Sequence, residues 1–433
     1  MEKNNSLVGD IKIKSIKDLL ECYHVVINIY AFYKLIVEGF FMQKRGENLL
    51  PLRIIDFNFN LLGELDLYTS TQLGVSWSDI GVAEIQVNRY VQHADKLVKD
   101  NIIIPYNRVD QAYIIRHREI ELDQDGKQTE NWLVKALSLK TFMSQRLIYP
   151  AVGKTHESIT GNVETVMRHF VNTQMINPSD PARKFPNLIL GENLNRGEVI
   201  EEKSRYDPLH EKLKELSELH GLGWNVELDL QQKKFVFVLL NGEDKTANQV
   251  GRPQVVFSTE RETLESLEYT ESDVNYKNFA VVAGQGEGLD RRIISVGDTT
   301  ASGAARYEMF VDARDISEET EGENPQPRPP QKIVEDLQKR GNEKLTEHAQ
   351  TIYLSGQILT KSNLVYGVDY QLGDRVTIRD KGWGVTMDAR ITAVKEVHEY
   401  GSNKLELTFD NDKPTFMSVM RNMLGEIKNE WKR

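Results

Sequence analysis

Cysteine is almost missing from this 433-residue chain, which holds only Cys22. A chain with one thiol cannot form a disulfide within itself, and it cannot build a zinc site from several cysteines. The fold must therefore rest on packing and hydrogen bonds, which suits assembly in a reducing compartment.

Basic residues are also fewer than acidic residues. The chain has 54 lysines and arginines against 65 aspartates and glutamates, a net charge of −11 and a pI of about 5.5. A protein that grips nucleic acid needs a basic patch or stripe, and no such cluster appears in the sequence. We therefore expect no sequence-specific binding of nucleic acid. An acidic surface would instead let DNA pass without adhering, because like charges repel.

Long uninterrupted apolar runs are lacking as well. The most apolar stretch, residues 19–41, is broken by Glu21, His24, Lys34 and Glu38. Each charge near a bilayer centre costs roughly 2.5–3.5 kcal/mol, so stable membrane insertion is not expected. Two interpretations of residues 1–48 stay open. They form a packed or partner-binding helix, or they are a non-native extension upstream of a natural start at Met42.

The first half of the remaining chain contains two different patterns. Residues 49–150 alternate between apolar and polar side chains, as in half-buried strands. Within this range, residues 112–122 and 131–139 flank Asp125-Gly126, which is a strong signal for a hairpin turn. The two observations predict an antiparallel β domain. Residues 151–254 mix helical and strand periods. The clearest helix is predicted for residues 206–221, with Asp207 as its cap, Pro208 in its first turn and Gly221 at its end.

The second half is again rich in strand patterns. We expect a second β-rich region over residues 255–320, and a proline-rich loop with a charged helix over 321–350. A C-terminal β domain over 351–433 would end in a short helix. The length suits two to four domains. The predicted class is α+β and β-rich, made of antiparallel β domains with an α/β insertion.

Three motifs resemble nucleotide-, phosphate- or metal-binding sites, but none has the full pattern that its site requires. The glycines of Gly284-Gln-Gly286-Glu-Gly288 have strand patterns on both sides, whereas a dinucleotide fingerprint must lead into a helix. Gly153-Lys154-Thr155 lacks the earlier glycine of a phosphate-binding loop, and the nine histidines form no metal-binding pair. We therefore assign no catalytic, cofactor-binding or metal-binding residue. A pair of carboxylates acting on sugars is defined by its spacing in the fold, and the sequence alone leaves it open.

Residues 275–315 predict a long hairpin that carries charges of both signs. Arginine can form two parallel bonds to a carboxylate across a subunit boundary and fix its register. The alternative is a solvated hairpin whose ion pairs contribute little. The residues that we expect at a subunit interface are Asp290, Arg291, Arg292, Arg306, Asp312, Arg314 and Asp315.

The same stretch resembles the ReqiPepy-type siphovirus tail protein family, known from phages and prophages of Gram-positive bacteria. The features that carry the resemblance are Asn275-Tyr276-Lys277-Asn278, the glycine loop, Gly297-Asp298, Arg306-Tyr307-Glu308, residues 311–315, Leu222-Gly223-Trp224, Leu372-Gly373-Asp374 and Arg390-Ile391-Thr392. The resemblance covers about residues 49–416 and is most specific in the middle. Residues 1–41 have no counterpart.

The resemblance implies a non-enzymatic hub of a tail baseplate, with barrel-like tube domains that carry α/β insertions. It implies three chains in a ring under the tail tube, in contact with distal tail components, with a channel for DNA. The protein would be part of the virion tail after assembly in the host cytoplasm, with no cofactor. The alternatives are a tail-associated cell-wall hydrolase, for which the chain leaves little room after its last strand pattern, and a host-surface carbohydrate binder.

Overall fold

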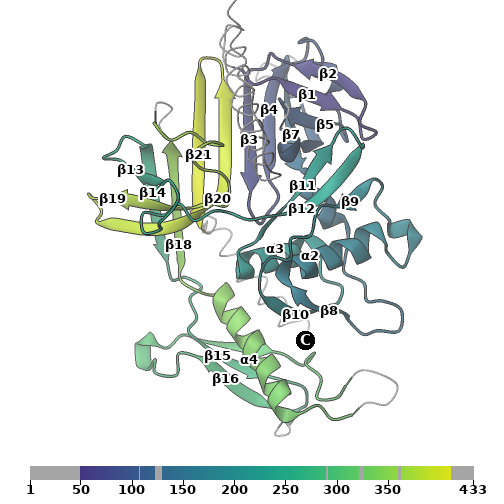
Figure 1. Cartoon of the computed structure of the whole chain (residues 1–433), viewed down its shortest axis with the longest axis vertical. Helices are drawn as coiled ribbons and strands as arrows, with labels where there is room; N and C mark the ends of the chain where they lie inside the picture. The colour runs from purple at the N-terminus through teal and green to yellow at the C-terminus, as the bar shows by residue number, and fades with distance from the viewer. Residues whose placement is uncertain are drawn as a thin grey trace, which may run out of the picture. The chain divides into compact units, whose positions relative to one another are not determined.

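The computed structural model describes residues 49–106, 108–121, 129–288, 291–320, 326–358 and 362–410 (Figure 1). The N-terminal extension, the Asp125-Gly126 turn, Asp290 and the helix predicted for residues 414–433 lie outside these ranges. In the described part of the chain, no helix is long and apolar enough to cross a membrane.

The largest element is a sheet of thirteen strands among the described residues, nearly all antiparallel. Its main order is β14-β18-β21-β20-β3-β4-β7-β6-β5-β1-β2, and β13 and β19 join it beside β20. The strands are β1 (Leu52–Ile55), β2 (Leu61–Leu65), β3 (Ser70–Ser76), β4 (Val82–Asn88), β5 (Ile102–Pro105), β6 (Tyr113–Glu119), β7 (Asn131–Ser138), β13 (Val256–Ser258), β14 (Leu264–Ser272), β18 (Thr351–Ile358), β19 (Arg375–Asp380), β20 (Val385–Glu399) and β21 (Ser402–Asp410).

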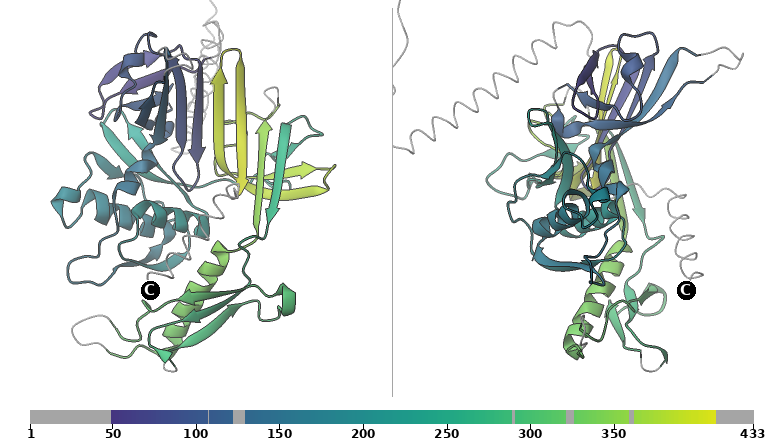
Figure 2. Two further views of the ribbon diagram at one scale, coloured as in Figure 1. Left: turned by 180° about the vertical axis from the view of Figure 1, so that it is seen from behind. Right: turned by 90° about the vertical axis from the view of Figure 1, so that its right-hand side faces the viewer.

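The pairing of β3 with β20 joins the first and last parts of the chain. The two strands run antiparallel from Ala393 opposite Ser76 to Glu399 opposite Ser70, and both views in Figure 2 show them side by side. The predicted antiparallel pairing of β6 with β7 is confirmed. The described strand order is open, with β14 and β2 at its ends. Separate closed barrels, which the family resemblance implies, are not seen among these strands, because the first region continues directly into the last.

Between β7 and β13 lies the predicted mixture of helices and strands. Its elements are β8 (Glu157–Asn162), α2 (Val163–Val171), the π-helix η4 (Asn172–Ile176), β9 (Leu188–Leu190), β10 (Val199–Ser204), α3 (Leu209–His220), β11 (Gly223–Asp229) and β12 (Lys234–Leu240). Short 3-10 helices are η1 (Ala94–Lys96), η2 (Val109–Gln111), η3 (Leu139–Gln145), η5 (Pro181–Arg183) and η7 (Gly303–Ala305). The helices α2 and α3 and the strands β11 and β12 pack around one apolar core.

Helix α3 confirms the best helix prediction with one change at its start. Leu209, Leu213 and Leu216 are fully buried on one face, and Gly221 ends the helix with a left-handed φ of 73°. Pro208 is the residue before the helix, with an extended ψ of 127°. Asp207 instead accepts a hydrogen bond from the Ser204 hydroxyl at 2.7 Å. The helix therefore begins three residues after the start of the predicted range at residue 206, and one residue after Pro208, the predicted first helical position.

A three-stranded sheet and one helix form a smaller lobe. Strand β15 (Phe279–Ala283) lies between β16 (Ile293–Gly297), which is antiparallel to it, and β17 (Glu308–Asp312), which is parallel. Helix α4 (Pro330–Glu347) crosses this sheet and buries Ile333 and Leu337 against it (Figure 1). The glycine loop thus joins two paired strands, which confirms the reading of Gly284–Gly288 as a hairpin loop.

Candidate functional site

The predicted interface residues gather around the three-stranded sheet. Arg291 precedes β16, and its guanidinium donates to the carbonyls of Gly284 and Ala283 at 2.8 and 2.9 Å and to the Asp312 carboxylate. The side chains of Arg291 and Asp312 are only 12% and 10% exposed. Arg314 lies 3.5 Å from the same carboxylate. Three of the predicted residues therefore form one cluster that closes the ends of β15, β16 and β17.

The other predicted residues that the structure describes, Arg292, Arg306 and Asp315, also have partners within the chain. Arg292 pairs with Glu318 at 3.1 Å, and Arg306 pairs with Glu308 at 2.6 Å. Asp315 contacts Arg340 of α4 at 2.9 Å. These ion pairs connect parts of the same lobe. A contact of these residues with another subunit stays a prediction. Arg314 and Asp315 keep 61% and 50% of their side chains exposed and are the most accessible of the predicted residues that the structure describes.

One face of the small sheet presents apolar side chains to solvent. Ile293 and Phe310 are 56% and 58% exposed, although the opposite face is covered by α4. The Arg291 guanidinium lies 5.6 Å from the centre of the Phe310 ring. Exposed apolar side chains bordered by charges are typical of a contact surface. We define this face, with Arg314 and Asp315 at its border, as the candidate assembly surface.

A second feature, which the sequence analysis missed, is the position of Trp77 at the end of β3. Its ring packs directly on Gly223 and Gly373. A Cβ added to either glycine would come within 2.5 or 2.0 Å of the ring. The Arg390 guanidinium lies 5.2 Å from the ring centre. Gly223, Gly373 and Arg390 belong to three of the motifs that carried the family resemblance, so these motifs meet at one aromatic side chain.

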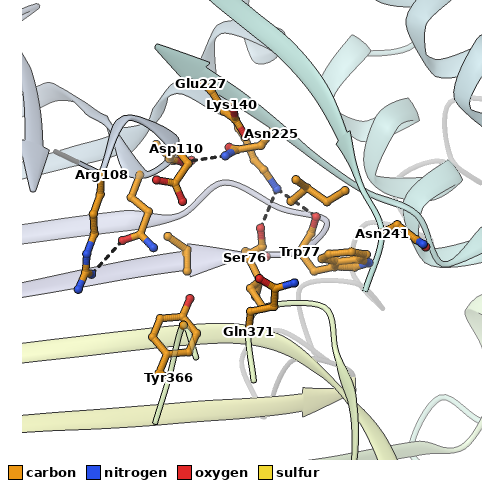
Figure 3. Close-up of a pocket in the computed structure, with 16 residues that line it drawn as sticks. Ser76, Trp77, Arg108, Asp110, Lys140, Asn225, Glu227, Asn241, Tyr366 and Gln371 are labelled. Carbon is orange, nitrogen blue, oxygen red and sulfur yellow. Dashed lines mark hydrogen bonds between the residues drawn. The ribbon is translucent and has the colours of Figure 1, made fainter. Parts of the chain in front are cut away.

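Lysine 140 lies buried beside this tryptophan. Its ammonium group donates to the carbonyls of Ser76 and Trp77 at 2.7 and 3.1 Å (Figure 3). It also lies 4.6 Å from the centre of the Trp224 ring. Burial lowers the pKa of Lys140 to about 7, although the nearby Asp79 carboxylate favours the charged form. Lys140, in η3, is therefore hydrogen-bonded to the end of β3, and its ammonium group contacts the Trp224 ring of the α/β region.

A cavity of about 420 Å³ opens next to Lys140 (Figure 3). Asp110 and Glu227 line it, together with Arg108 and Tyr366. Burial and the neighbouring Asp110 raise the pKa of Glu227. Arg108 turns toward Gln111 and is also paired with Glu396 of β20. In the described residues, no group of three or more histidine, cysteine, aspartate or glutamate side chains is placed to hold a metal ion.

The fold resembles that of solved tail proteins. The 43 kDa tail protein of prophage MuSo2 from Shewanella oneidensis superposes with a TM-score of 0.50 at 10% sequence identity, over 83% of this chain and 98% of that one. The tail protein from Neisseria meningitidis MC58 gives a TM-score of 0.50 at 12% identity, over 84% and 96%. At these identities the similarity establishes a shared fold.

Sequence comparison gives the family. No curated protein sequence matches the chain significantly. The sequence model of the family described as siphovirus ReqiPepy6 Gp37-like protein matches residues 51–409. This range includes the small sheet and the residues packed around Trp77 (Gly223, Gly373 and Arg390), which we call the Trp77 cluster. The chain is therefore a member of the siphovirus ReqiPepy6 Gp37-like protein family.

Proposed function

We propose that this protein is a structural, non-enzymatic subunit of a phage or prophage tail tip. It would form a baseplate hub ring that joins the tail tube to distal tail components and leaves a channel for DNA. The observation that carries the proposal is the family match over residues 51–409. A fold shared over nearly the full length of two tail proteins supports it.

The large sheet is continuous from the first to the last part of the chain, which supports a role as the framework of such a ring. The pairing of β3 with β20 makes one continuous surface from the first and last parts of the chain, and the buried Trp77 cluster ties the α/β region to it. In the proposal, three chains assemble so that this sheet curves into barrel-like tube domains. Residues 49–150, 255–320 and 351–433 would build the ring, and residues 151–254 and 321–350 would be carried on it.

The net charge of −11 supports an acidic lining of the channel, which would keep the DNA backbone from adhering. The partners would be other copies of the chain, the tail tube and further tail-tip proteins, in a virion tail assembled in the host cytoplasm. An assembled ring with a strongly basic lumen would contradict the proposed lining.

Light scattering coupled to gel filtration, followed by negative-stain imaging, tests the proposal. We expect a particle with the mass of three chains and a ring-shaped outline. The purified tail tube protein should bind to one of its faces. A compact monomer that fails to bind the tube protein would contradict the hub function.

The cavity provides one specific observation for a second function, hydrolysis of cell-wall glycans. Asp110 and Glu227 form a carboxylate pair, and a carboxyl with a raised pKa suits a general acid. A zymogram on host cell walls separates the two functions. Clearing by the wild type that is lost in Glu227→Gln would support the hydrolase, whereas the hub proposal expects no clearing from either chain.

A further inference from the structure

Two exposed tyrosines meet at the surface of the α/β region. The rings of Tyr149 and Tyr206 lie edge to face with their centres 5.6 Å apart, and the residues are 46% and 53% exposed. Arg183 lies 3.9 Å from the centre of the Tyr149 ring, and Arg205 lies 5.1 Å from that of Tyr206. With Arg146 these residues form what we call the Tyr–Arg patch. Tyrosine and arginine are enriched among the residues that dominate protein interfaces.

Two arginines of the patch, Arg146 and Arg183, donate hydrogen bonds to neutral groups. Arg146 donates to the Arg183 carbonyl at 2.9 Å, and Arg183 donates to the Leu147 carbonyl at 2.5 Å and to the Gln174 amide oxygen at 3.0 Å.

Asp180 accepts a bond from the Ala182 backbone and Asp207 accepts one from the Ser204 hydroxyl, so both keep their charge, and Asp180 attracts Arg183 at longer range. Among the described residues, none of the three arginines of the patch forms a salt bridge, in a chain whose net charge is −11.

The backbone holds the patch in place before any partner binds. Gln174, which is 1% exposed and sits in the π-helix η4, accepts a bond from the Tyr149 amide at 2.9 Å and donates to its carbonyl at 3.0 Å. Tyr206 has a left-handed φ of 61°, which is unusual for an aromatic residue. Its amide donates to the Ile148 carbonyl at 2.7 Å, which keeps this conformation. Strained residues of this kind concentrate at binding sites.

A surface of opposite charge lies elsewhere on the same chain. Residues 260–273 contain six carboxylates and a single arginine, Arg261. They include β14, which ends the described order of the large sheet. Glu265 and Glu271 accept bonds from glutamine amides, each at 2.7 Å, so their charges are not neutralised by these partners. We call this stretch the acidic segment.

We propose that the Tyr–Arg patch of one copy docks on the acidic segment of a second copy. This inference rests on the proposed ring function. Contact between two unlike patches is head to tail, so it closes into a ring when the rotation fits and grows into a filament when it does not. Hydrogen bonds from arginine to carboxylate would fix the orientation of the two copies, and the tyrosines would supply buried apolar area. Salt would weaken the contact, because it screens the charges.

The test compares charge-reversal variants of the full chain by light scattering at several concentrations and salt levels. Arg205→Glu should raise the dissociation constant about tenfold or more, because it places a carboxylate opposite the acidic segment. Glu265→Arg should do the same, and the two changes together should restore association. The matched control is Arg89→Glu, beside the exposed Tyr90 at a separate site, which should leave association unchanged. Melting curves check that each variant folds.

The outcomes separate this inference from the hub proposal. A ring of three that persists unchanged in Arg205→Glu overturns the docking contact and leaves the hub function standing. A filament that Arg205→Glu disrupts supports the contact and contradicts a closed ring. A wild type that stays monomeric at every concentration overturns the docking contact, and it overturns the hub function as well if it also fails to bind the tail tube protein. The patch could instead hold nucleic acid. Binding of a labelled single-stranded oligonucleotide that Arg205→Glu abolishes, with self-association unchanged, would overturn docking between copies.

Discussion

Trp77 shows how one side chain can decide the residue type at two distant positions. Its ring is 3% exposed, and it packs where only the hydrogen of Gly223 or Gly373 leaves space. Its backbone amide also donates to the Thr392 carbonyl at 2.8 Å. Three segments that are far apart in the sequence, around Gly223, Gly373 and Thr392, therefore depend on the packing of Trp77.

Gly223→Ala tests this packing. The new Cβ would lie 2.5 Å from the ring, so we expect a loss of about 1–3 kcal/mol in the free energy of unfolding. Urea denaturation measures the loss. Gly382→Ala is the matched control, because its Cβ meets only the end of the Asp380 side chain at 3.2 Å. Equal stability of the two variants would contradict the role of Trp77.

Lys140 predicts a stability that depends on pH. Its pKa of about 7 in the folded protein lies below the unfolded value of about 10.4, so the unfolded chain binds more protons between these two values. The free energy of unfolding should therefore gain from this residue as pH rises through that window, and the cost of the buried charge is fully present below about pH 7.

Urea denaturation at several pH values measures this slope. Lys140→Met should flatten it, because methionine carries no charge to titrate. At high pH, where the wild type bears little cost of a buried charge, the loss of bonds to the Ser76 and Trp77 carbonyls should lower stability by about 1–3 kcal/mol. Lys135→Met, at a lysine that is 47% exposed, is the control and should keep the wild-type slope. The same slope in Lys140→Met and wild type would rule out the proposed titration.

At the level of elements, α4 shows how a charged helix is positioned by few apolar contacts. Leu337 is fully buried against the small sheet, and Gly341 allows close approach, because an added Cβ would lie 2.4 Å from Val296. Most other positions of the helix face solvent. The helix and the sheet thus depend on each other.

Leu337→Ala should destabilise this lobe by about 2–5 kcal/mol, because it leaves a cavity between α4 and the sheet. Limited proteolysis detects the effect as faster cleavage within residues 275–350. The control is Glu335→Ala, at a side chain that is 65% exposed, and its cleavage rate should match the wild type. Cleavage of Leu337→Ala at the wild-type rate would show that α4 is not held in this way.

For the whole molecule, the decisive contact is between the first and last parts of the chain. Besides the β3–β20 pairing, Arg108 from the loop after β5 forms an ion pair with Glu396 of β20, whose side chain is 12% exposed. A buried pair contributes little over an apolar replacement, but removal of one partner leaves a charge uncompensated.

A double-mutant cycle tests this coupling. Arg108→Met should cost about 1–3 kcal/mol, because Glu396 loses its guanidinium but keeps His398 at 3.4 Å, and the double variant Arg108→Met with Glu396→Met should recover much of that loss. Urea denaturation of the four chains gives the coupling energy. Additive losses would mean that the pair does not link the two parts of the sheet.

Local patterns in the sequence determined the elements of this protein and its family. Helix α3, helix α4, the β6–β7 pair and the strands around Gly284 follow from apolar period and turn residues, which act over a few positions. The family resemblance in residues 274–316 agrees with the family match over 51–409.

Tertiary structure alone decided how these elements are joined. The β3–β20 pairing links residues more than three hundred positions apart, and it replaces separate closed units by one open sheet. It also decided that Arg291 and Asp312 pair with each other inside the lobe, that Trp77 occupies the space left by two glycines, and that Tyr149 meets Tyr206. Such contacts depend on distance in space, which periodicity along the chain does not encode.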